Sequence, residues 1–245
     1  MGIAPYKVIL SYNGSAFAGF QRQNDERTVQ GEFEKSLRKM GWDGHSILAA
    51  GRTDAGVHAK AQVVSFQLEW NHSVEDLRNA LNYYLPNDMA VQRVDETPEG
   101  FHPRFDAKAR HYVYHCFCSP VRDPIREVFA WRVWPQVELD RMNLAAQELL
   151  GSHDFAAFGS PTSESGVTVR EVFSAKWQQI GDELQFSIIA NAFLYHMVRR
   201  ITFTLVSIGQ GESPVSLITD SLAAGSLDVT GLAPAEGLVL EEIIY

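Results

Sequence analysis

The stretch GRTDAGVHAKAQVVSFQL (51–68) joins a charged, glycine-containing segment to a run of alternating apolar residues. Val64, Phe66 and Leu68 recur at every second position, which is the pattern of a strand with one buried face. The glycines of GRTDAG disfavour a helix, and Asp and Gly are frequent where a chain reverses direction. We therefore predict that Asp54 lies on a loop between two strands.

Regular elements are predicted on both sides of this loop. Residues 6–12 alternate between apolar and polar like one face of a strand. Residues 28–40 have the apolar spacing of a helix, and Thr28 is suited to its N-cap. A second helix is expected to begin with a capping box at Ser73 and to end at Pro86.

The second half of the chain has a similar order of elements. A helix is predicted from Leu139 to Leu149, strands over about 167–190, a long buried helix over 193–208 and a last strand at the end. Such interleaving predicts an α+β fold of two related subdomains, residues 1–105 and 106–245. We expect them to share a mainly antiparallel sheet with helices packed on it, and to hold an active-site cleft between the two halves.

Composition narrows the class of protein. The chain has 245 residues, of which 45% are hydrophobic, and no apolar run approaches the roughly 18 residues of a membrane span. Its start lacks a basic leader, so we expect no membrane and a cytoplasmic protein. Cys116 and Cys118 are the two cysteines, and their spacing along a strand disfavours a disulfide bond, as in a reducing compartment.

The net charge of −9 argues at first against a nucleic-acid partner, because phosphates attract cations. However, residues 212–245 hold six of the 30 acids and none of the 21 bases, so residues 1–211 carry a net of 24 − 21, or −3. Residues 184–211 contain no acid but include Arg199 and Arg200. Five further basic residues gather earlier in the chain: Arg104, Lys108, Arg110, Arg122 and Arg126. A basic cleft on an acidic body is consistent with this distribution.

Several familiar chemistries lack their motifs. There is no phosphate-binding loop ending in Gly-Lys-Ser/Thr, no dinucleotide fingerprint and no nucleophile elbow. A metal site is not expected, because His111 and His115 alternate with Cys116 and Cys118 and face the opposite side of a strand. His58 is interpreted as a hydrogen-bonding residue in preference to a catalytic base, because no Ser or Cys nucleophile accompanies it.

Several blocks resemble the TruA family of tRNA pseudouridine synthases, in the order in which that family has them. They are YNGSAFAGFQRQ (12–23), TVQGEFEKSL (28–37), GRTDAGVHA (51–59), FHPRFDAKARHYVY (101–114), LLGSHDFAAF (149–158), NAFLYHMVRRI (191–201) and APAEGLVLEEIIY (233–245). The similarity spans almost the whole chain. Three positions depart from the usual family pattern: Asn13 where Asp is commoner, Phe20 where Trp is commoner, and Asp106 where a small hydroxyl residue is usual.

This resemblance implies an isomerase that converts uridine to pseudouridine in the anticodon stem-loop of tRNA, at positions 38–40. It implies that Asp54 is the nucleophile, that Arg52 and Arg199 supply charge to it, and that the enzyme acts as a homodimer. The reaction involves no redox change or energy input, so no cofactor is expected. Attack at the ribose C1′ and at the uracil C6 both remain open.

The resemblance also implies that Tyr112 stacks on the uracil, since the strand pattern alone would favour a core role for both Tyr112 and Tyr114. Arg199 lies in an otherwise apolar segment and must be paired there, and the resemblance makes Asp54 its preferred partner. Tyr195 and His196 are interpreted as packing and hydrogen-bonding residues of the same helix. Four more arginines are candidates for RNA contacts, with ordinary ion-paired surface as the alternative: Arg22, Arg104, Arg110 and Arg200.

Two other classes of protein compete with the isomerase. A non-catalytic tRNA-binding protein on the same fold would bind tRNA without changing it. A hydrolase that uses Asp54 and His58 would cleave its substrate.

Overall fold

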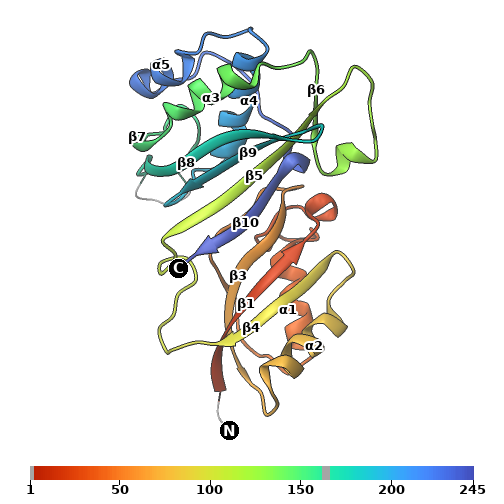
Figure 1. Ribbon diagram of the computed structural model, residues 1–245. Helices are drawn as coiled ribbons and strands as arrows, with labels where there is room; N and C mark the ends of the chain where they lie inside the picture. The colour runs from red at the N-terminus through yellow and green to blue at the C-terminus, as the bar shows by residue number, and fades with distance from the viewer. Residues whose placement is uncertain (1–2, 162–165) are drawn as a thin grey trace. The chain divides into compact units, whose positions relative to one another are not determined.

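Residues 3–161 and 166–245 are described by the computed structural model of this chain (Figure 1). The chain divides into two units, one comprising residues 1–108 and 240–245 and the other residues 109–239. The last strand, β10 (Leu238–Ile244), therefore begins in the second unit and ends in the first. Within the described residues, no helix is long and apolar enough to cross a membrane.

Three antiparallel strands form the sheet of the first unit, in the order β4, β1, β3. They are β1 (Ile3–Tyr12), β3 (His58–Glu69) and β4 (Met89–Glu96), and the short β2 (Leu48–Ala49) also pairs with β3. Tyr6 of β1 lies opposite Phe66 of β3 in the register. Alternate residues of β1 are buried, as the sequence pattern predicted.

Two helices cover one face of this sheet, α1 (Val29–Arg38) and α2 (Val74–Tyr84) (Figure 1). Thr28 caps α1 by accepting a hydrogen bond from the N–H of Gly31, and Ser73 and Asp76 form a capping box at the start of α2. The Phe33 ring of α1 lies 5.8 Å from the Phe66 ring. Both predicted helices are confirmed, because cap residues and apolar spacing agree at each.

The second unit contains the antiparallel strands β5, β9, β8 and β7, in that order, and a short β6 that runs parallel to β5. Their bounds are β5 (Ala109–Cys118), β6 (Trp131–Val133), β7 (Gly151–Asp154), β8 (Val169–Ile180) and β9 (Glu183–Ala190). Its helices are α3 (Leu139–Gln147), α4 (Met197–Gly209) and α5 (Leu217–Ala224). The described residues also include the short 3-10 helices η1 (Gly14–Ala16), η2 (Arg126–Val128) and η3 (Ala235–Gly237).

Aromatic stacking and one amide fix the helices of the second unit. The Trp177 and Phe186 rings of β8 and β9 stack at 5.1 Å, and Trp131 of β6 stacks on Phe203 of α4 at 6.1 Å. The Asn143 side chain of α3 accepts from the backbone N–H of Trp177 at 2.8 Å and donates to the Trp177 carbonyl at 3.1 Å. The amide thus satisfies both backbone groups of this β8 residue. The predicted α+β class is confirmed.

The long helix begins later than the sequence predicted. The pattern placed its start at residue 193, but α4 begins at Met197, because His196 adopts a left-handed φ of 64°. The Tyr195 N–H donates to the Ser160 carbonyl at 2.9 Å, so its backbone bonds a distant segment instead of a helix. Tyr195 and His196 thus lie outside the helix, with their rings stacked at 3.7 Å.

Candidate active site

The segment that carries Asp54 connects β2 to β3 and is held at both ends. The Ala50 N–H donates to the Val63 carbonyl at 2.9 Å, and the Gln62 amide donates to the Gly51 carbonyl at 3.2 Å. Beyond the aspartate, the Val57 N–H donates to the Asp54 carbonyl at 3.2 Å, which closes a turn. The loop predicted from sequence is confirmed, and its backbone is firmly anchored.

Thr53 fixes the loop to the core immediately before the aspartate. Its hydroxyl shares a 2.8 Å hydrogen bond with the phenol of Tyr12, and its carbonyl accepts from the Phe20 N–H at 3.0 Å. Burial raises the pKa of Tyr12 to about 12, against smaller opposing effects of hydrogen bonds with Thr53 and Gln62. The phenol therefore stays protonated at neutral pH and remains a stable partner of the loop.

Two glycines let the segment 13–20 approach this loop closely. A Cβ on Gly14 would lie 2.1 Å from the Val57 carbonyl oxygen, and one on Gly19 would lie 3.1 Å from the Thr53 carbonyl oxygen. Gly19 also has a φ of 99°, which side chains rarely allow. Sequence reasoning missed this support, although the block YNGSAFAGF carries both glycines and Tyr12.

His58 is buried directly after the loop, and its Nδ1 accepts a hydrogen bond from the Gly14 N–H at 3.0 Å. This is the hydrogen-bonding role that the sequence analysis preferred over a catalytic base. Because Nδ1 accepts this bond, the ring holds the segment 13–20 against the start of β3.

The side chains of the loop divide by depth. Thr53, Val57 and His58 are buried, whereas Asp54 is half-buried and Arg52 is exposed. Asp54 therefore combines a fixed backbone with a side chain that is partly open to solvent. Asp54 and Arg52 belong to the first unit and Tyr112 and Arg199 to the second, so their convergence stays a prediction.

Tyr112 and Tyr114 differ, although they occupy the same face of β5. Tyr114 is fully buried and donates from its phenol to the Pro234 carbonyl at 2.6 Å, which confirms its core role. Burial raises the pKa of Tyr114 well above its usual value. Tyr112 is half-buried, with its ring edge-on to Phe193 at 5.2 Å.

Arg199 lies in the first turn of α4 and is half-buried. Its Nε donates to the Ala233 carbonyl at 2.7 Å, and the Ala233 N–H donates to the Arg199 carbonyl at 3.3 Å. These two bonds fix the side chain and backbone of Arg199 against residue 233.

The four other candidate arginines have different surroundings. Arg22 pairs at 2.5 Å with Glu34, whose side chain is fully buried. Arg110 donates to the Asn191 carbonyl at 2.7 Å, and Arg104 is exposed. Arg200 lines a cavity of about 530 Å³ in the second unit, together with residues 225–227 and 229–232.

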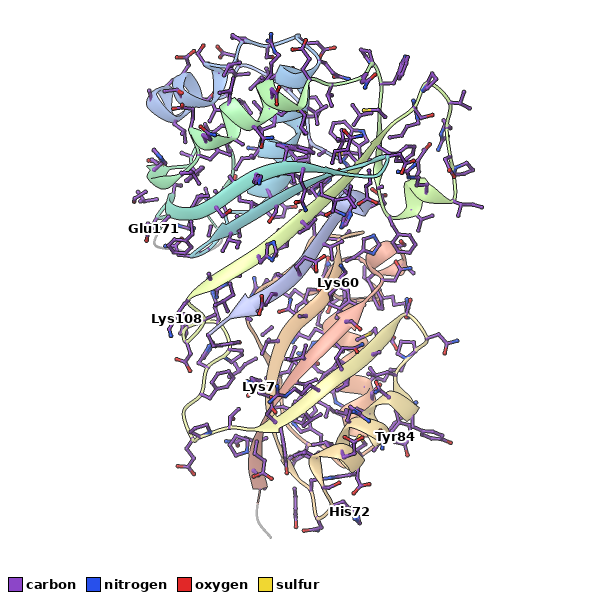
Figure 2. The ribbon with its side chains drawn as sticks, in the orientation of Figure 1. Lys7, Lys60, His72, Tyr84, Lys108 and Glu171 are labelled. Atoms are coloured by element: carbon purple, nitrogen blue, oxygen red, sulfur yellow. The ribbon has the colours of Figure 1, made fainter. Side chains whose placement is uncertain are left out.

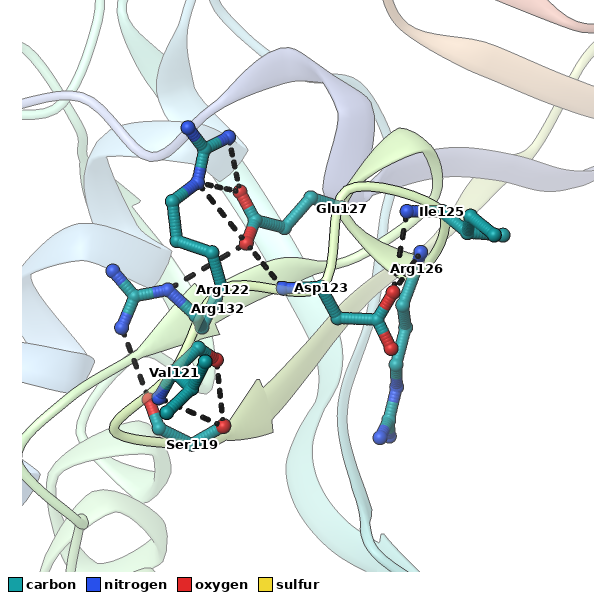
Figure 3. Close-up of polar contacts among 8 residues, drawn as sticks. All are labelled: Ser119, Val121, Arg122, Asp123, Ile125, Arg126, Glu127 and Arg132. Atoms are coloured by element: carbon teal, nitrogen blue, oxygen red, sulfur yellow. Dashed lines mark hydrogen bonds and ion pairs between the residues drawn. The ribbon is translucent and has the colours of Figure 1, made fainter.

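Two basic residues noted in the sequence, Arg122 and Arg126, are paired with acids, and Figure 3 shows the pair of Arg122 with Glu127. Arg122 lies 2.8 Å from Glu127, which also contacts Arg132 at 3.6 Å, and Arg126 lies 2.6 Å from Asp182. Hydrogen bonding from Arg122 holds the pKa of Glu127 below its usual value. Neighbouring carboxylates therefore offset the charge of these two arginines.

No group of three or more His, Cys, Asp or Glu side chains gathers in a way suited to a metal ion among the residues that the structure describes. On β5 the Cys116 thiol is buried, and burial raises its pKa well above the usual value. On the same strand His115 lies 2.5 Å from Glu183.

Comparison with known proteins finds similarity over the whole chain. A family profile described as "tRNA pseudouridine synthase" matches residues 8–106 and 145–245. The "tRNA pseudouridine synthase A" of Brevibacillus brevis is 38% identical over 240 residues, covering 98% of each chain. The protein of the same name from Geobacillus kaustophilus is 40% identical over 246 residues, covering 98% of this chain and 93% of its own.

Proposed function

The chain belongs to the tRNA pseudouridine synthase family and isomerises uridine in tRNA, and we propose that it does so through Asp54 in the anticodon stem-loop, at positions 38–40. The observation that carries the assignment of Asp54 is its half-buried carboxylate on an anchored loop. The resemblance of GRTDAGVHA to the family block supports the same residue.

The reaction rearranges uridine without changing its composition. The N1 to C1′ bond breaks, the uracil turns, and C5 bonds to C1′, while the C5 proton passes to solvent and N1 takes up a proton. No electrons enter or leave, so the chemistry needs no redox cofactor. A carboxylate forms the transient covalent bond, by attack at C1′ or at C6, and is released when the new C–C bond is complete.

Charge around Asp54 completes this proposal. Arg52 is two residues away, and Arg199 of α4 is proposed to supply the second positive charge. Two cations favour the ionised carboxylate, which is the nucleophilic form. They also balance negative charge on the RNA near the reacting nucleotide.

The target uracil must leave its stack before the carboxylate reaches it, at a cost of a few kcal/mol. Tyr112 is proposed to hold the flipped base, since a stacked aromatic ring contributes about 1–3 kcal/mol per base. Its half-buried position, in contrast to the buried Tyr114, supports this role.

Phosphate contacts are proposed for Arg22, Arg104, Arg110 and Arg200. Support is strongest for Arg104, which is exposed, and for Arg200, which lines the cavity in the second unit. From the family resemblance we also propose a homodimer that works in the cytoplasm.

A tritium-release assay tests the site of reaction. Transfer RNA labelled with tritium at uridine C5 is incubated with the protein in excess chelator, and released tritium and product nucleosides are measured. We expect release of the label and pseudouridine at positions 38–40, and substrates with cytidine at all three positions should release none. Equal release from those substrates would overturn the assigned positions, and chain cleavage would indicate a hydrolase.

A further inference from the structure

Phe105 is a large apolar side chain that lies 75% exposed on a tightly bonded turn, residues 102–106. The Asp106 N–H donates to the His102 carbonyl at 3.0 Å, and the Asp106 carboxylate accepts from the His102 N–H at 2.9 Å. The His102 Nδ1 accepts from the N–H groups of Arg104 at 3.1 Å and of Phe105 at 3.4 Å. Side-chain and backbone bonds thus define the turn without any contribution from burial of Phe105.

The turn is also fixed to the body of the first unit. The Tyr245 phenol donates to the Pro103 carbonyl at 2.9 Å, and the Tyr245 ring lies 5.4 Å from the Phe101 ring. Lys7, labelled on β1 in Figure 2, lies 5.9 Å from the centre of the Phe101 ring and 5.6 Å from that of Tyr245. After the turn, the Lys108 N–H donates to the Ile244 carbonyl at 2.8 Å, so the backbone is held on both sides of Phe105.

The surroundings of Phe105 fit a nucleobase better than a protein partner. Its ring is backed by the His102 ring at 4.2 Å and a tilt of 35°, and the Arg104 guanidinium lies 5.9 Å from its centre. Arg104, Asp106 and Lys108 are all exposed. The core of a protein interface is depleted of charged residues, whereas a ring beside an arginine suits a base and its phosphate.

We propose that Phe105 is a stacking platform for an unpaired nucleobase of the bound tRNA, and that Arg104 contacts a neighbouring phosphate. This inference rests on the proposed RNA-binding role of Arg104. It adds a second aromatic contact, on the first unit, to the one proposed for Tyr112. It also gives the unusual Asp106 a role, because its carboxylate closes the turn as a hydroxyl would.

Binding measurements on tRNA separate stacking from simple apolar contact. All variants carry Asp54→Asn, so that turnover does not change the substrate. We expect Phe105→Ala to weaken binding by about 5- to 150-fold, which corresponds to the usual 1–3 kcal/mol of one stacked base. Phe105→Trp should stay within a few-fold of the parent, and Phe105→Leu should behave like Phe105→Ala. Tyr83→Ala is the matched control, since Tyr83 is 82% exposed on α2 of the same unit.

A salt series adds a second readout. Stacking releases no counterions, so Phe105→Ala should shift affinity equally at every salt concentration, whereas Arg104→Ala should lower the log-log slope by about one. Ultraviolet crosslinking of the parent to tRNA should attach RNA to the peptide 101–108. Circular dichroism and sedimentation check that fold and oligomeric state are unchanged.

Three results would overturn the inference: equal affinity of Phe105→Ala and the parent, equal affinity of Phe105→Leu and the parent, or a change in oligomeric state in place of RNA affinity. The last would assign Phe105 to a protein contact. Failure of the proposed function would look different, because the parent protein itself would then bind tRNA no better than an unrelated RNA.

Discussion

Residues with the same place in a sequence pattern acquire different roles from what packs on them. Tyr112 and Tyr114 are two residues apart on β5, and alternation alone treats them alike. Gly237 approaches the Tyr114 ring so closely that a Cβ there would lie 2.6 Å from it, which encloses that ring. Tyr112, in contrast, is half-buried and lies edge-on to Phe193.

Substitution of Tyr112 tests its proposed role. A phenylalanine ring and a tyrosine ring can both stack on uracil, but only the phenol can exchange a proton or donate a hydrogen bond. We expect Tyr112→Phe to bind tRNA normally and to turn over slowly, and Tyr112→Ala to lose affinity by about 1–3 kcal/mol. Binding and single-turnover rates measure both. A wild-type rate for Tyr112→Ala would return Tyr112 to a core role.

At the scale of elements, the loop that carries Asp54 depends on segments that precede it in the chain. Its anchors come from Tyr12, Gly14 and Gly19, all within the block that joins β1 to α1. In the same block, the Asn13 side chain accepts from the Ser15 N–H at 3.1 Å, as an aspartate would, and Phe20 is buried. Both family departures thus keep a structural role.

Gly19→Ala tests whether this support positions Asp54. A Cβ would press on the Thr53 carbonyl and strain a φ of 99°, so we expect turnover to fall by about 100-fold, as when a reacting group is misplaced by 1 Å. Gly41→Ala is the control, because Gly41 has a φ of 89° with nothing within 4 Å of a Cβ. Both should lose about 1–3 kcal/mol of stability through strain. Equal turnover in the two variants would argue against the positioning role.

An ion pair also holds the segment between β1 and α1. Arg27, before α1, pairs with Asp88, before β4, and the two N to O distances are 2.7 and 2.8 Å. Hydrogen bonding from Arg27 lowers the pKa of Asp88, so the folded state favours its ionised form. This stabilisation is present above the unfolded pKa of about 3.9 and is lost as the pH falls toward the lower folded value.

Asp88→Asn should therefore destabilise the protein more at pH 6 than at pH 3. Urea unfolding at both values measures the difference between wild type and variant, and other carboxylates cancel because both proteins contain them. A difference that is the same at the two pH values would show that Asp88 contributes nothing to the acid sensitivity.

At the scale of the whole molecule, a net charge of −9 must be reconciled with a polyanionic substrate. Ion pairs among the described residues show which arginines already have an acidic partner. Arg22 and Arg122 serve acids of their own unit, whereas Arg104 is exposed and Arg200 lines a cavity. Of these four, Arg104 and Arg200 are the ones better placed to meet RNA.

A salt series on single Arg→Ala variants tests this division. We expect Arg104→Ala and Arg200→Ala each to lower the log-log slope of tRNA binding by about one unit. Arg22→Ala should cost more stability than either, because Glu34 would remain buried with fewer partners. Slopes equal to wild type for Arg22, Arg104, Arg110 and Arg200 would place the RNA on another surface.

Sequence alone predicted the fold class, both helices of the first unit and the Asp54 loop, because periodicity, caps and turn residues agree there. It misplaced the start of α4, because the mostly apolar residues 193–197 continue the helical pattern whereas the Tyr195 backbone bonds to Ser160. It also missed the anchors of the loop and the exposure of Phe105. These depend on contacts between segments far apart in the chain, which residue types do not fix.

The central claim is that Asp54 is the nucleophile, and turnover by Asp54→Asn tests it most directly. The amide matches the carboxylate in size and preserves the loop, but it cannot form the covalent bond. Tritium release is measured at saturating tRNA, with mass spectrometry to exclude deamidation at position 54. We predict no release above background and a tRNA affinity within a few-fold of wild type. Measurable turnover by protein with an intact amide at this position would contradict the claim.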